Sequence, residues 1–339
     1  MYRHSRRRST GVGWGLVGLG RAADTMIGPA ITSDPNGRLV AVVSRDQGRA
    51  DAFGAKHGAD WAGTDYEAML SNPSVDVVMI TTPNAHHADQ VVAAAQAGKH
   101  VVSDKPLGIN AADARRALDA CQKGDVQLGV MFESRLMPCF QEIRRLLVDG
   151  ELGEILLIQA DFSAGKGSHT GWRADPELAG LGSVLNLGVH TYDILCFLLD
   201  SDVGDVSAMF DSIVLPELEM VAMVLMRFAN GTLAFVNSNE VTPMPVNGLI
   251  IHGSDGRIEG RGLTSPGRGG DLSVVTRHGE RIVHYTDDDC WGRTIRGFTN
   301  ALIDGHPFSP SGLDGLRSAE LTDAIAASAR TGATVSLSR

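Results

Sequence analysis

The sequence has few of the residues from which metal centres and disulfide frameworks are built. Its 339 residues include only four cysteines, Cys121, Cys139, Cys196 and Cys290, and no two of them form a C-x-x-C pair. A zinc site needs clustered ligands, and a disulfide framework needs closely spaced cysteines. We therefore predict no metal site and expect free thiols in a reducing compartment.

Basic residues and long apolar runs are also scarce. The chain carries 30 Lys and Arg against 40 Asp and Glu, a formal net charge of -10. A nucleic-acid-binding surface has to neutralise phosphates with basic side chains, so we expect no nucleic-acid partner, whereas a small polar substrate is compatible with an acidic protein. No apolar run approaches the roughly 20 residues that a membrane helix needs, and we expect no membrane partner.

The first ten residues contain several arginines and precede the apolar stretch Val12–Leu19, a pattern superficially similar to an export signal. That stretch also carries the glycine turn described below, so cleavage after it would remove the first strand. We interpret residues 1–10 as a flexible tail and expect the protein in the cytoplasm.

The first half of the chain alternates short β-rich runs with helical stretches. The run Val75–Thr81 is almost continuously apolar, as in a parallel strand buried on both faces. The other predicted strands are Val12–Val17, Leu39–Ser44, His100–Ser103 and Gln127–Phe132, and the helices between them include Gln47–His57, Ala85–Ala97 and Asn110–Lys123. This alternation predicts an α/β domain over residues 11–134 with a doubly wound parallel sheet of the Rossmann kind.

The pattern changes after about residue 135. Two predicted helices, Pro138–Asp149 and Gly182–Leu199, precede a series of strands without helices between them. The strands are Val206–Val214, Val221–Phe228, Thr232–Asn239, Leu249–His252, Leu272–Thr276 and Arg281–Tyr285. Residues 135–339 are therefore predicted to form an α+β domain with a large, mostly antiparallel open sheet. The glycine-rich piece Gly260–Gly270 is expected to be a surface loop, and helices Thr294–Asp304 and Leu313–Thr331 end the chain, the last of them free to pack back on the first domain.

A dinucleotide-binding motif follows the first predicted strand. Residues Gly18, Gly20, Arg21, Ala22 and Ala23 belong to a G-x-G-x-x-A pattern that leads into a predicted helix. Glycine allows a tight turn and a close approach of the backbone to a pyrophosphate, and the helix N-terminus offers N–H groups to that anion. The alternative is that the glycines serve only the turn, but their place in a strand–turn–helix unit favours a cofactor site.

The end of the second predicted strand bears on which cofactor binds. An NAD site places a carboxylate there for the ribose 2′-hydroxyl, whereas this strand ends in Ser44 and Arg45, with Asp46 only afterwards. A hydroxyl and a guanidinium suit a 2′-phosphate, so we favour NADP. The alternative leaves Arg45 as a surface charge and Asp46 on the ribose of NAD.

Two later stretches carry groups suited to proton and substrate handling. Asp104-Lys105-Pro106 follows a parallel strand at the edge where ligands bind in such sheets, and the proline restricts Lys105 to extended geometry. On a helix, Asn186, His190 and Asp193 share one face, and histidine is the side chain best suited to move a proton near neutral pH. Taken alone, such a lysine is more often a surface charge and such a histidine more often structural.

Together these motifs resemble the glucose–fructose oxidoreductase, inositol dehydrogenase and rhizopine-catabolism family (Gfo/Idh/MocA). The resemblance covers essentially the whole chain after the tail. The motifs that carry it are G-x-G-x-x-A at Gly18–Ala23, T-P-N-x-x-H at Thr82–His87, Asp104-Lys105-Pro106 for the family's E-K-P, Trp172-Arg173, the His190 helix, and Gly312-Leu313-Asp314-Gly315 with the final Thr331-Gly332. It implies hydride transfer on sugars, polyols or related cyclic compounds, with pairing of subunits through the open sheet into dimers or tetramers.

The resemblance also implies roles for individual residues. Lys105 would bind the reacting oxygen, and His190 would be the general acid and base. The residues implied to line or close the cofactor site are Thr82, Pro83, Asn84, His87, Asp104, Trp172 and Arg173. Two residues depart from the family pattern, since Asp104 replaces glutamate and Asn186 replaces aspartate. Because an amide lacks the carboxylate's charge, we predict that His190 holds its proton less tightly than in relatives with aspartate there.

Two other functions are compatible with the same motifs. One is a regulator that senses NAD(P) without catalysis, and the other is a redox-assisted glycosidase or lyase that regenerates its cofactor within one turnover. The substrate is not predicted, although Phe132, Arg135, His169, Tyr192 and Asp289 are candidates for its pocket. Arg135 and His169 suit a substrate carboxylate, and a structural or solvated role is the alternative for both.

Overall fold

The computed structural model describes residues 11–165, 170–213, 215–264, 269–286 and 289–337. The predicted tail 1–10 and the candidate His169 therefore lie outside the described residues. The chain divides into two compact units: a first unit of Met1–Glu133 with Trp291–Ala319, and a second unit of Ser134–Cys290 with Glu320–Arg339.

The first unit contains a six-stranded sheet in which every strand pair is parallel. Its strands in spatial order are β3 (Trp61–Gly63), β2 (Gly37–Val43), β1 (Val12–Val17), β4 (Val77–Ile80), β5 (His100–Ser103) and β6 (Leu128–Val130). All residues of β1, β4 and β5 are buried, which explains their nearly continuous apolar character. The strand order reverses between β1 and β4, and ligands bind beyond the carboxyl ends of strands at such a switch point. The predicted doubly wound fold is confirmed.

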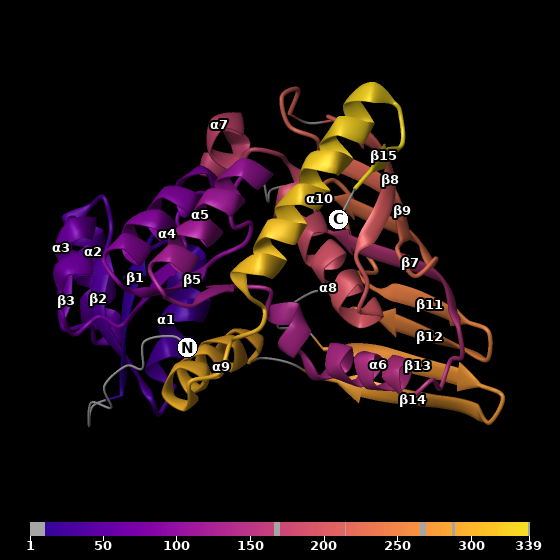
Figure 1. Ribbon diagram of the computed structural model, residues 1–339, viewed down its shortest axis with the longest axis horizontal. Coiled ribbons are helices and arrows are strands. Elements are labelled where there is room, and N and C mark those ends of the chain that lie inside the picture. Colours follow the sequence, from indigo (N-terminus) through magenta and orange to yellow (C-terminus); the bar gives the residue numbers. More distant parts are fainter. Residues whose placement is uncertain (1–10, 166–169, 214, 265–268, 287–288, 338–339) are drawn as a thin grey trace. The chain divides into compact units, whose positions relative to one another are not determined.

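Side-chain caps fix where several helices of this unit begin. Asp46 accepts a hydrogen bond from the backbone N–H of Arg49 at the start of α2 (Gln47–His57), and Asn110 does the same for α5 (Ala111–Lys123). The remaining helical segments are the π-turn η1 (Ala23–Ile27), α1 (Gly28–Thr32), α3 (Tyr66–Ser71), the 3₁₀ turn η2 (Asn84–His86) and α4 (His87–Gln96). Figure 1 shows the sheet with α4 and α5 packed beside each other.

Helix α9 (Cys290–Asp304) belongs to the first unit, although the sequence suggested one continuous second domain over residues 135–339. The reason is apolar packing. Phe298 is fully buried against the ring of Trp14 in β1, with ring centroids 6.0 Å apart, and against Phe308 at 5.1 Å. Burying such aromatic side chains is worth roughly 1.5–3 kcal/mol each. Helix α10 (Gly312–Thr331) contributes its first part to this unit and its second part to the other.

The second unit contains a nine-stranded, mostly antiparallel sheet. Its strands in spatial order are β14 (Gly279–Tyr285), β13 (Gly270–Thr276), β12 (Gly256–Arg261), β11 (Leu249–Gly253), β7 (Ile155–Ser163), β10 (Leu233–Asn239), β9 (Val221–Phe228), β8 (Val203–Asp211) and β15 (Val335–Ser336). The only parallel neighbours among these strands are β7 and β10. The predicted open sheet is confirmed, but β7, at its centre, was not predicted.

The prediction of a surface loop at Gly260–Gly270 was wrong at both ends. Strand β12 extends to Arg261, and β13 begins at Gly270. Gly260 lies opposite Leu272 in the ladder, and Leu263 is buried, so the glycines accommodate tight packing between strands. Residues 265–268 lie outside the described residues.

One face of the nine-stranded sheet is covered by helices, and the other is open. The covering elements include α6 (Pro138–Val148), the π-turn η5 (Val184–Gly188) and α8 (Val189–Leu199), which pack on one another and on β7 and β10 (Figure 1). Strand β9 alternates strictly, with Ala222, Val224 and Met226 buried. On the opposite side of that strand Met223 and Leu225 are about half exposed, so the open face is apolar in part. Short segments η3 (Glu133–Leu136), η4 (Gly171–Ala174) and α7 (Pro176–Ala179) complete the described elements.

One helical stretch, Pro176–Leu199, has the length and apolar composition of a membrane span, which the sequence analysis had not identified. Of the 18-residue window that meets these criteria, 72% is buried within the protein, as in the core helix of a compact unit. This stretch carries Asn186 and His190, so the residues predicted for proton transfer lie on the most apolar helix of the described chain.

Candidate cofactor and active site

The glycine turn after β1 is built around Gly18. Its φ is +91°, and a Cβ there would lie 2.6 Å from both the carbonyl carbon of Thr81 and the nitrogen of Thr82. The Thr81 hydroxyl donates hydrogen bonds to the carbonyl oxygens of Val17 (3.0 Å) and Gly18 (2.6 Å). The backbone after β4 therefore approaches the turn so closely that only glycine fits.

Gly20 differs from Gly18 in that the protein's own packing does not require it. It is exposed, and a Cβ built on it would meet no atom within 4 Å. A glycine that faces open space at the start of a helical run leaves room for a ligand to approach the backbone. The residues present thus fit the pyrophosphate of a dinucleotide, with the backbone of Arg21 and Ala22 beginning the helix.

The carboxylate closest in sequence to this turn, Asp24, is hydrogen-bonded to side chains of α2. The Lys56 ammonium donates to it at 2.7 Å, and Nε2 of His57 lies 2.9 Å away. These hydrogen bonds, that of Lys56 first, hold the pKa of Asp24 below its usual range. Its negative charge is therefore balanced by its own partners, which reduces repulsion of a phosphate bound at the turn.

Two charged residues follow β2: Asp46, whose carboxylate caps α2, and Arg45, whose guanidinium is exposed. Oδ1 of Asp46 accepts a hydrogen bond from the N–H of Arg49 at 2.7 Å, and the N–H of Asp46 donates to Oγ of Ser44 at 3.3 Å. Arg45 is exposed and forms no ion pair with any of the described residues. One oxygen of Asp46 is thus committed to the helix cap, whereas the Arg45 guanidinium is available to an anion.

The loop after β4 carries Thr82, Pro83 and Asn84, and His87 anchors it. His87 is fully buried; Nδ1 lies 2.7 Å from the carbonyl oxygen of Pro106 and Nε2 lies 2.8 Å from that of Thr82. The ring therefore ties this loop to the one after β5. The sequence analysis expected His87 to line the cofactor cleft, but the structure gives it contacts that position its neighbours instead.

Lys105 follows β5 at the same edge of the sheet. The N–H of Asp104 donates to the carbonyl of Ile80 at 2.8 Å, and Oδ1 of Asp104 accepts from the N–H of Lys105 at 2.8 Å. The Lys105–Pro106 peptide is cis. Because parallel strands end at one edge, the Gly18 turn and the half-buried Lys105 both lie along the carboxyl edge of the first unit's sheet.

In the second unit, Asn186 and His190 lie on a helix that begins with a π-turn. We call η5 and α8 together (Val184–Leu199) the His190 helix. The buried carboxylate of Glu219 caps its start, accepting from the N–H groups of Gly182 (2.8 Å) and Val184 (2.9 Å). The half-buried His190 ring meets the ring of Phe162 edge-on, with centroids 5.6 Å apart. π-turns of this kind occur frequently at functional sites.

Asp193, predicted on the same helix face, is bound by Arg135. Nε and Nη2 of the guanidinium donate to its two carboxylate oxygens at 2.7 and 2.6 Å, and both side chains are buried. Arg135 therefore has the structural role that was the alternative to binding a substrate carboxylate. Tyr192 and Phe132 are also fully buried, and burial raises the pKa of the Tyr192 hydroxyl.

The sequence analysis missed Glu240. This carboxylate is fully buried directly after β10, and its Oε1 accepts a hydrogen bond of 2.6 Å from Nδ2 of Asn186. No motif surrounds Glu240, and the two residues are 54 positions apart, so only the unusual asparagine at 186 hinted that a partner group is present.

Two further predicted residues, Trp172 and Arg173, form a stacked pair on η4. The guanidinium carbon of Arg173 lies 4.3 Å from the centroid of the Trp172 ring, and both side chains are half-buried. No group of three or more His, Cys, Asp or Glu side chains with metal-site geometry occurs within the described ranges.

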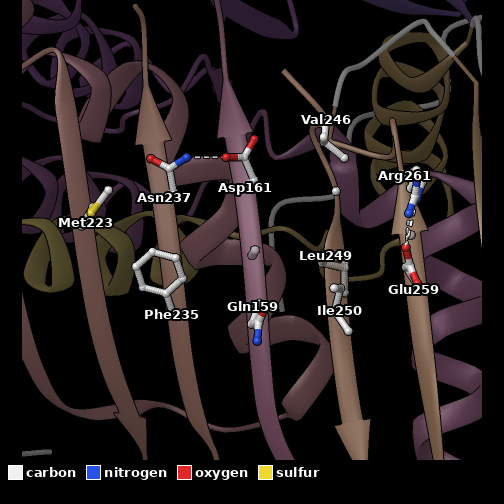
Figure 2. A pocket seen from close by; sticks show the side chains of 13 residues that line it. Gln159, Asp161, Met223, Phe235, Asn237, Val246, Leu249, Ile250, Glu259 and Arg261 are labelled. Carbon is white, nitrogen blue, oxygen red and sulfur yellow. Dashed lines mark hydrogen bonds and ion pairs between the residues drawn. The ribbon is translucent and has the colours of Figure 1, made fainter. Parts of the chain in front are cut away.

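A hollow of about 440 Å³ lies on the open face of the nine-stranded sheet (Figure 2). Its apolar lining includes Phe235, Met223 and Leu249. Its polar lining consists of the pairs Asn237–Asp161 and Arg261–Glu259 together with Gln159. None of the predicted cofactor or catalytic residues lines it.

Comparison with known proteins places both units in one group of enzymes. Residues 12–132 match the oxidoreductase family with an NAD-binding Rossmann fold (GFO_IDH_MocA), and residues 140–259 match a GFO/IDH/MocA C-terminal domain. A D-xylose 1-dehydrogenase (NADP(+)) of Haloferax volcanii is 30% identical over 96% of this chain and 99% of its own length. A 1,5-anhydro-D-fructose reductase of Ensifer adhaerens is 28% identical over 94% and 96%. The structure of an aldose-aldose oxidoreductase from Caulobacter crescentus, complexed with glycerol, has a TM-score of 0.90 at 25% identity and covers 96% of this chain and 100% of that one.

Proposed function

The chain belongs to the Gfo/Idh/MocA oxidoreductase family, and we propose that it transfers a hydride between a nicotinamide cofactor and a CH–OH carbon of a sugar, polyol or related cyclic compound. The observation that carries this proposal is the carboxyl edge of the six-stranded sheet. It combines a glycine turn that has open space at Gly20 with a lysine, Lys105, whose backbone N–H donates to the carboxylate of Asp104. The sugar enzymes among the relatives support the substrate class.

In the proposed reaction, the cofactor accepts or supplies the hydride and the chain's own residues handle the substrate oxygen and its proton. The Lys105 ammonium donates a hydrogen bond to that oxygen and orients it. A ring nitrogen of His190 takes the hydroxyl proton during oxidation and returns it during reduction. Such general acid–base help contributes on the order of 10²–10⁴ in rate, and orientation of the reacting carbon supplies much of the rest.

We further propose that NADP is the preferred cofactor, with NAD possible. The exposed Arg45 guanidinium and the Ser44 hydroxyl suit a 2′-phosphate, and an oxygen of Asp46 is engaged at the start of α2. The Haloferax relative, a dehydrogenase named for NADP(+), is consistent with this preference. In the same proposal, Thr82, Asn84 and the Trp172–Arg173 pair contact the cofactor, and His87 and Asp104 position the loops around it.

The open sheet face supports a homo-oligomer as the working form. Its exposed apolar side chains include Met209 (79% exposed), Leu225 (58%) and Leu233 (43%), on the neighbouring strands β8, β9 and β10. Exposed apolar area of this kind on one face marks an interaction surface. A second copy of the chain is the proposed occupant, since the face is continuous over neighbouring strands and the same face is available on each copy.

The experiment that tests the proposal begins with fluorescence titration of NADPH and NADH into the purified protein. The tighter cofactor is then used in a spectrophotometric screen with D-xylose, 1,5-anhydro-D-fructose, inositols and other cyclic polyols. We expect turnover on at least one sugar, and a loss of kcat of about 10²–10⁴ in His190→Ala with an unchanged cofactor Kd.

The other outcomes are decisive as well. Cofactor binding without turnover across the panel would contradict the catalytic proposal and favour a regulator that senses NAD(P). Absence of binding would contradict the dinucleotide site itself. An unaffected kcat in His190→Ala would remove this residue from proton transfer.

A further inference from the structure

The hollow on the open face of the nine-stranded sheet is lined by none of the residues proposed for hydride transfer. Its volume is about 440 Å³, within the roughly 300–1,000 Å³ of typical small-molecule sites. Its lining comes from β9, β10, β7, β11 and β12 and from the loop before β11, all within the second unit (Figure 2). Neighbouring strands of one sheet thus form a concave site of a size that suits a small molecule.

The apolar part of the hollow contains an aromatic ring. Phe235 is half-buried on β10, and Met223, on the neighbouring strand β9, is 49% exposed. In Figure 2 the Phe235 ring lies on one side of the hollow, and Val246 and Ile250 lie on the other. The negative face of an aromatic ring attracts C–H groups. This part of the hollow therefore suits the C–H side of a saturated ring.

One group of polar side chains in the hollow has fixed orientations. Nδ2 of Asn237 donates to the carboxylate of Asp161, and Oδ1 of Asn237 accepts from Nδ2 of Asn239 at 3.2 Å. The Ser163 hydroxyl lies 3.1 Å from each carboxylate oxygen of Asp161. Because these bonds determine which way the amides face, the polar side of the hollow is ordered before any ligand arrives.

Other polar side chains keep donors and acceptors for a ligand. Nε and Nη2 of Arg261 donate to Oε1 of Glu259 at 2.9 and 2.7 Å, which leaves Nη1 and Oε2 without a hydrogen bond to the described residues. Gln159 is exposed, and its amide forms no hydrogen bond within the described part of the chain. An amide supplies both donors and an acceptor. The hollow can therefore bond to several hydroxyl groups at once.

The charges in the hollow restrict the ligand further. The lining includes the carboxylates of Asp161 and Glu259, whereas its single cation, Arg261, is already paired with Glu259. An anionic ligand would be repelled by this excess of negative charge. A wholly apolar ligand would leave the polar groups unpaired, which is costly. A neutral molecule with a C–H side and several hydroxyl groups, such as a sugar or cyclic polyol, meets both conditions.

The second copy proposed for the open face uses other side chains. Met209, Leu225 and Leu233 lie on β8, β9 and β10, and none of them lines the hollow. The charged pair of the hollow lies on β12, on the side away from β8. An apolar surface seated over these groups would bury them without hydrogen bonds, so a hydroxylated ligand is the favoured occupant.

We propose that the hollow is a second binding site, for a neutral sugar or cyclic polyol, outside the site of hydride transfer. The C–H side of the ligand packs on Phe235 and Met223. Its hydroxyl groups bond to the Gln159 amide and to the unused atoms of the Arg261–Glu259 pair. Binding here involves neither the cofactor nor any residue of the proposed reaction, so the inference goes beyond the proposed function and does not depend on it.

Met223 provides a direct measurement, because its side chain lines the hollow. The full-length protein is labelled with carbon-13 in its methionine methyl groups, and the Met223 signal is assigned by comparison with Met223→Leu. D-xylose, D-glucose or D-glucuronate is then added without cofactor. We expect D-xylose and D-glucose to shift the Met223 signal saturably, with Kd on the order of millimolar. D-glucuronate, a ring of similar size with a carboxylate, should bind at least about tenfold more weakly than D-glucose.

Variants locate the ligand within the hollow. Phe235→Ala should weaken sugar binding at least about tenfold, and Gln159→Ala, at an exposed position that the fold does not need, about threefold to tenfold. Ile282→Ala is the control, because Ile282 is 58% exposed on β14 of the same sheet and does not line the hollow. His190→Ala should also keep the Met223 response, which separates this site from the proposed catalytic one.

Three results would overturn the inference. One is the absence of a saturable Met223 shift with up to about 100 mM sugar. Another is an affinity that neither Phe235→Ala nor Gln159→Ala changes, since the ligand then binds elsewhere. The third is a Met223 signal that changes with protein concentration and not with sugar, which would make a second copy the occupant. Failure of the protein to turn over any sugar would contradict the proposed function and leave the Met223 measurement unaffected.

Discussion

The two motif glycines in the turn after β1, Gly18 and Gly20, have different structural surroundings. Gly18 is required by the fold, since its φ is positive and Thr81 and Thr82 occupy the space of a side chain. Gly20 has open space around it, so packing within the chain does not require its lack of a side chain. In the proposed function, the G-x-G pattern therefore combines a structural requirement at Gly18 with a binding requirement at Gly20.

Alanine substitution separates these two tasks. We expect Gly18→Ala to lower the free energy of unfolding by about 2–4 kcal/mol, because the added methyl group clashes with backbone and the positive φ is strained. Gly20→Ala should leave the unfolding free energy within about 0.5 kcal/mol of wild type and weaken NADPH binding at least about tenfold. Urea unfolding and fluorescence titration measure the two effects, and equal loss of stability in both variants would contradict the distinction.

His100 links stability to pH. The ring is buried between β5 and β6, and its Nδ1 accepts a hydrogen bond from the N–H of Gln127 at 2.9 Å. Burial lowers the pKa of His100, with Asp76 and Asp125 opposing that shift. The folded protein thus favours the neutral ring, whereas the unfolded chain protonates near pH 6.5. Stability from this residue is complete above about pH 6.5 and is lost as the pH falls towards the folded-state pKa.

We therefore expect the unfolding free energy to fall between pH 6.5 and 5, by up to about 1.4 kcal/mol per pH unit from His100. His100→Asn keeps an acceptor for Gln127 and cannot be protonated, so its curve should be flatter over this interval. The exposed His278→Asn is the control and should keep the wild-type slope. A slope equal to wild type in His100→Asn would show that other groups cause the acid sensitivity.

At the scale of elements, the junction of β2 and α2 combines a helix cap with the proposed site for the cofactor's ribose. Asp46 caps α2, and Arg45 projects from the same junction without an ion pair among the described side chains. Because Asp46 caps α2 and Arg45 does not, we expect the two residues to affect different properties. Asp46 should affect the stability of the protein, and Arg45 should affect cofactor binding.

Substitutions at this junction should behave accordingly. Arg45→Ala should weaken NADPH binding by about 10–100-fold, the loss of a charge-assisted contact to phosphate, while NADH binding changes less than threefold. Asp46→Ala should instead lower the unfolding free energy by about 1 kcal/mol through loss of the cap. Titrations with both cofactors decide the matter: if Arg45→Ala weakens NADPH and NADH equally, the proposed 2′-phosphate contact is absent.

The sequence predicted an element well when the pattern that specifies it lies within the element itself, and poorly when the element depends on contacts with distant parts of the chain. Strands β1, β5 and β9 and helix α2 were predicted with their observed ends, because apolar runs, alternation and caps are local. Strand β3 was missed because it has three residues, and β7 because it pairs with β10 and β11 far along the chain. The motif residues of the candidate site stay predictions from local patterns, whereas Glu240 and the Arg135–Asp193 pair depend on contacts that only the fold creates.

At the scale of the whole molecule, the two sheets differ in how many of their faces are covered by other elements. The parallel sheet is covered on both faces, and part of its core comes from α9, late in the sequence. The nine-stranded sheet leaves one face with apolar side chains next to the hollow at Phe235 (Figure 2). These exposed apolar side chains support the proposal that this face binds a second copy of the chain.

Charge on this face should therefore separate the subunits. We expect the wild-type protein to sediment as a dimer or tetramer. Leu225→Lys should raise the Kd of subunit association at least about tenfold, because burying an ammonium group in an apolar interface is costly. Leu225 is 58% exposed, so the substitution leaves the monomer's core intact. Val148→Lys is the control for added charge, because Val148 is 74% exposed and lies at the end of α6, away from this sheet face. This variant should stay associated. Sedimentation velocity across a concentration series distinguishes the outcomes: a wild-type monomer at all concentrations contradicts the interface, and dissociation in both variants shows that net charge rather than this face controls assembly.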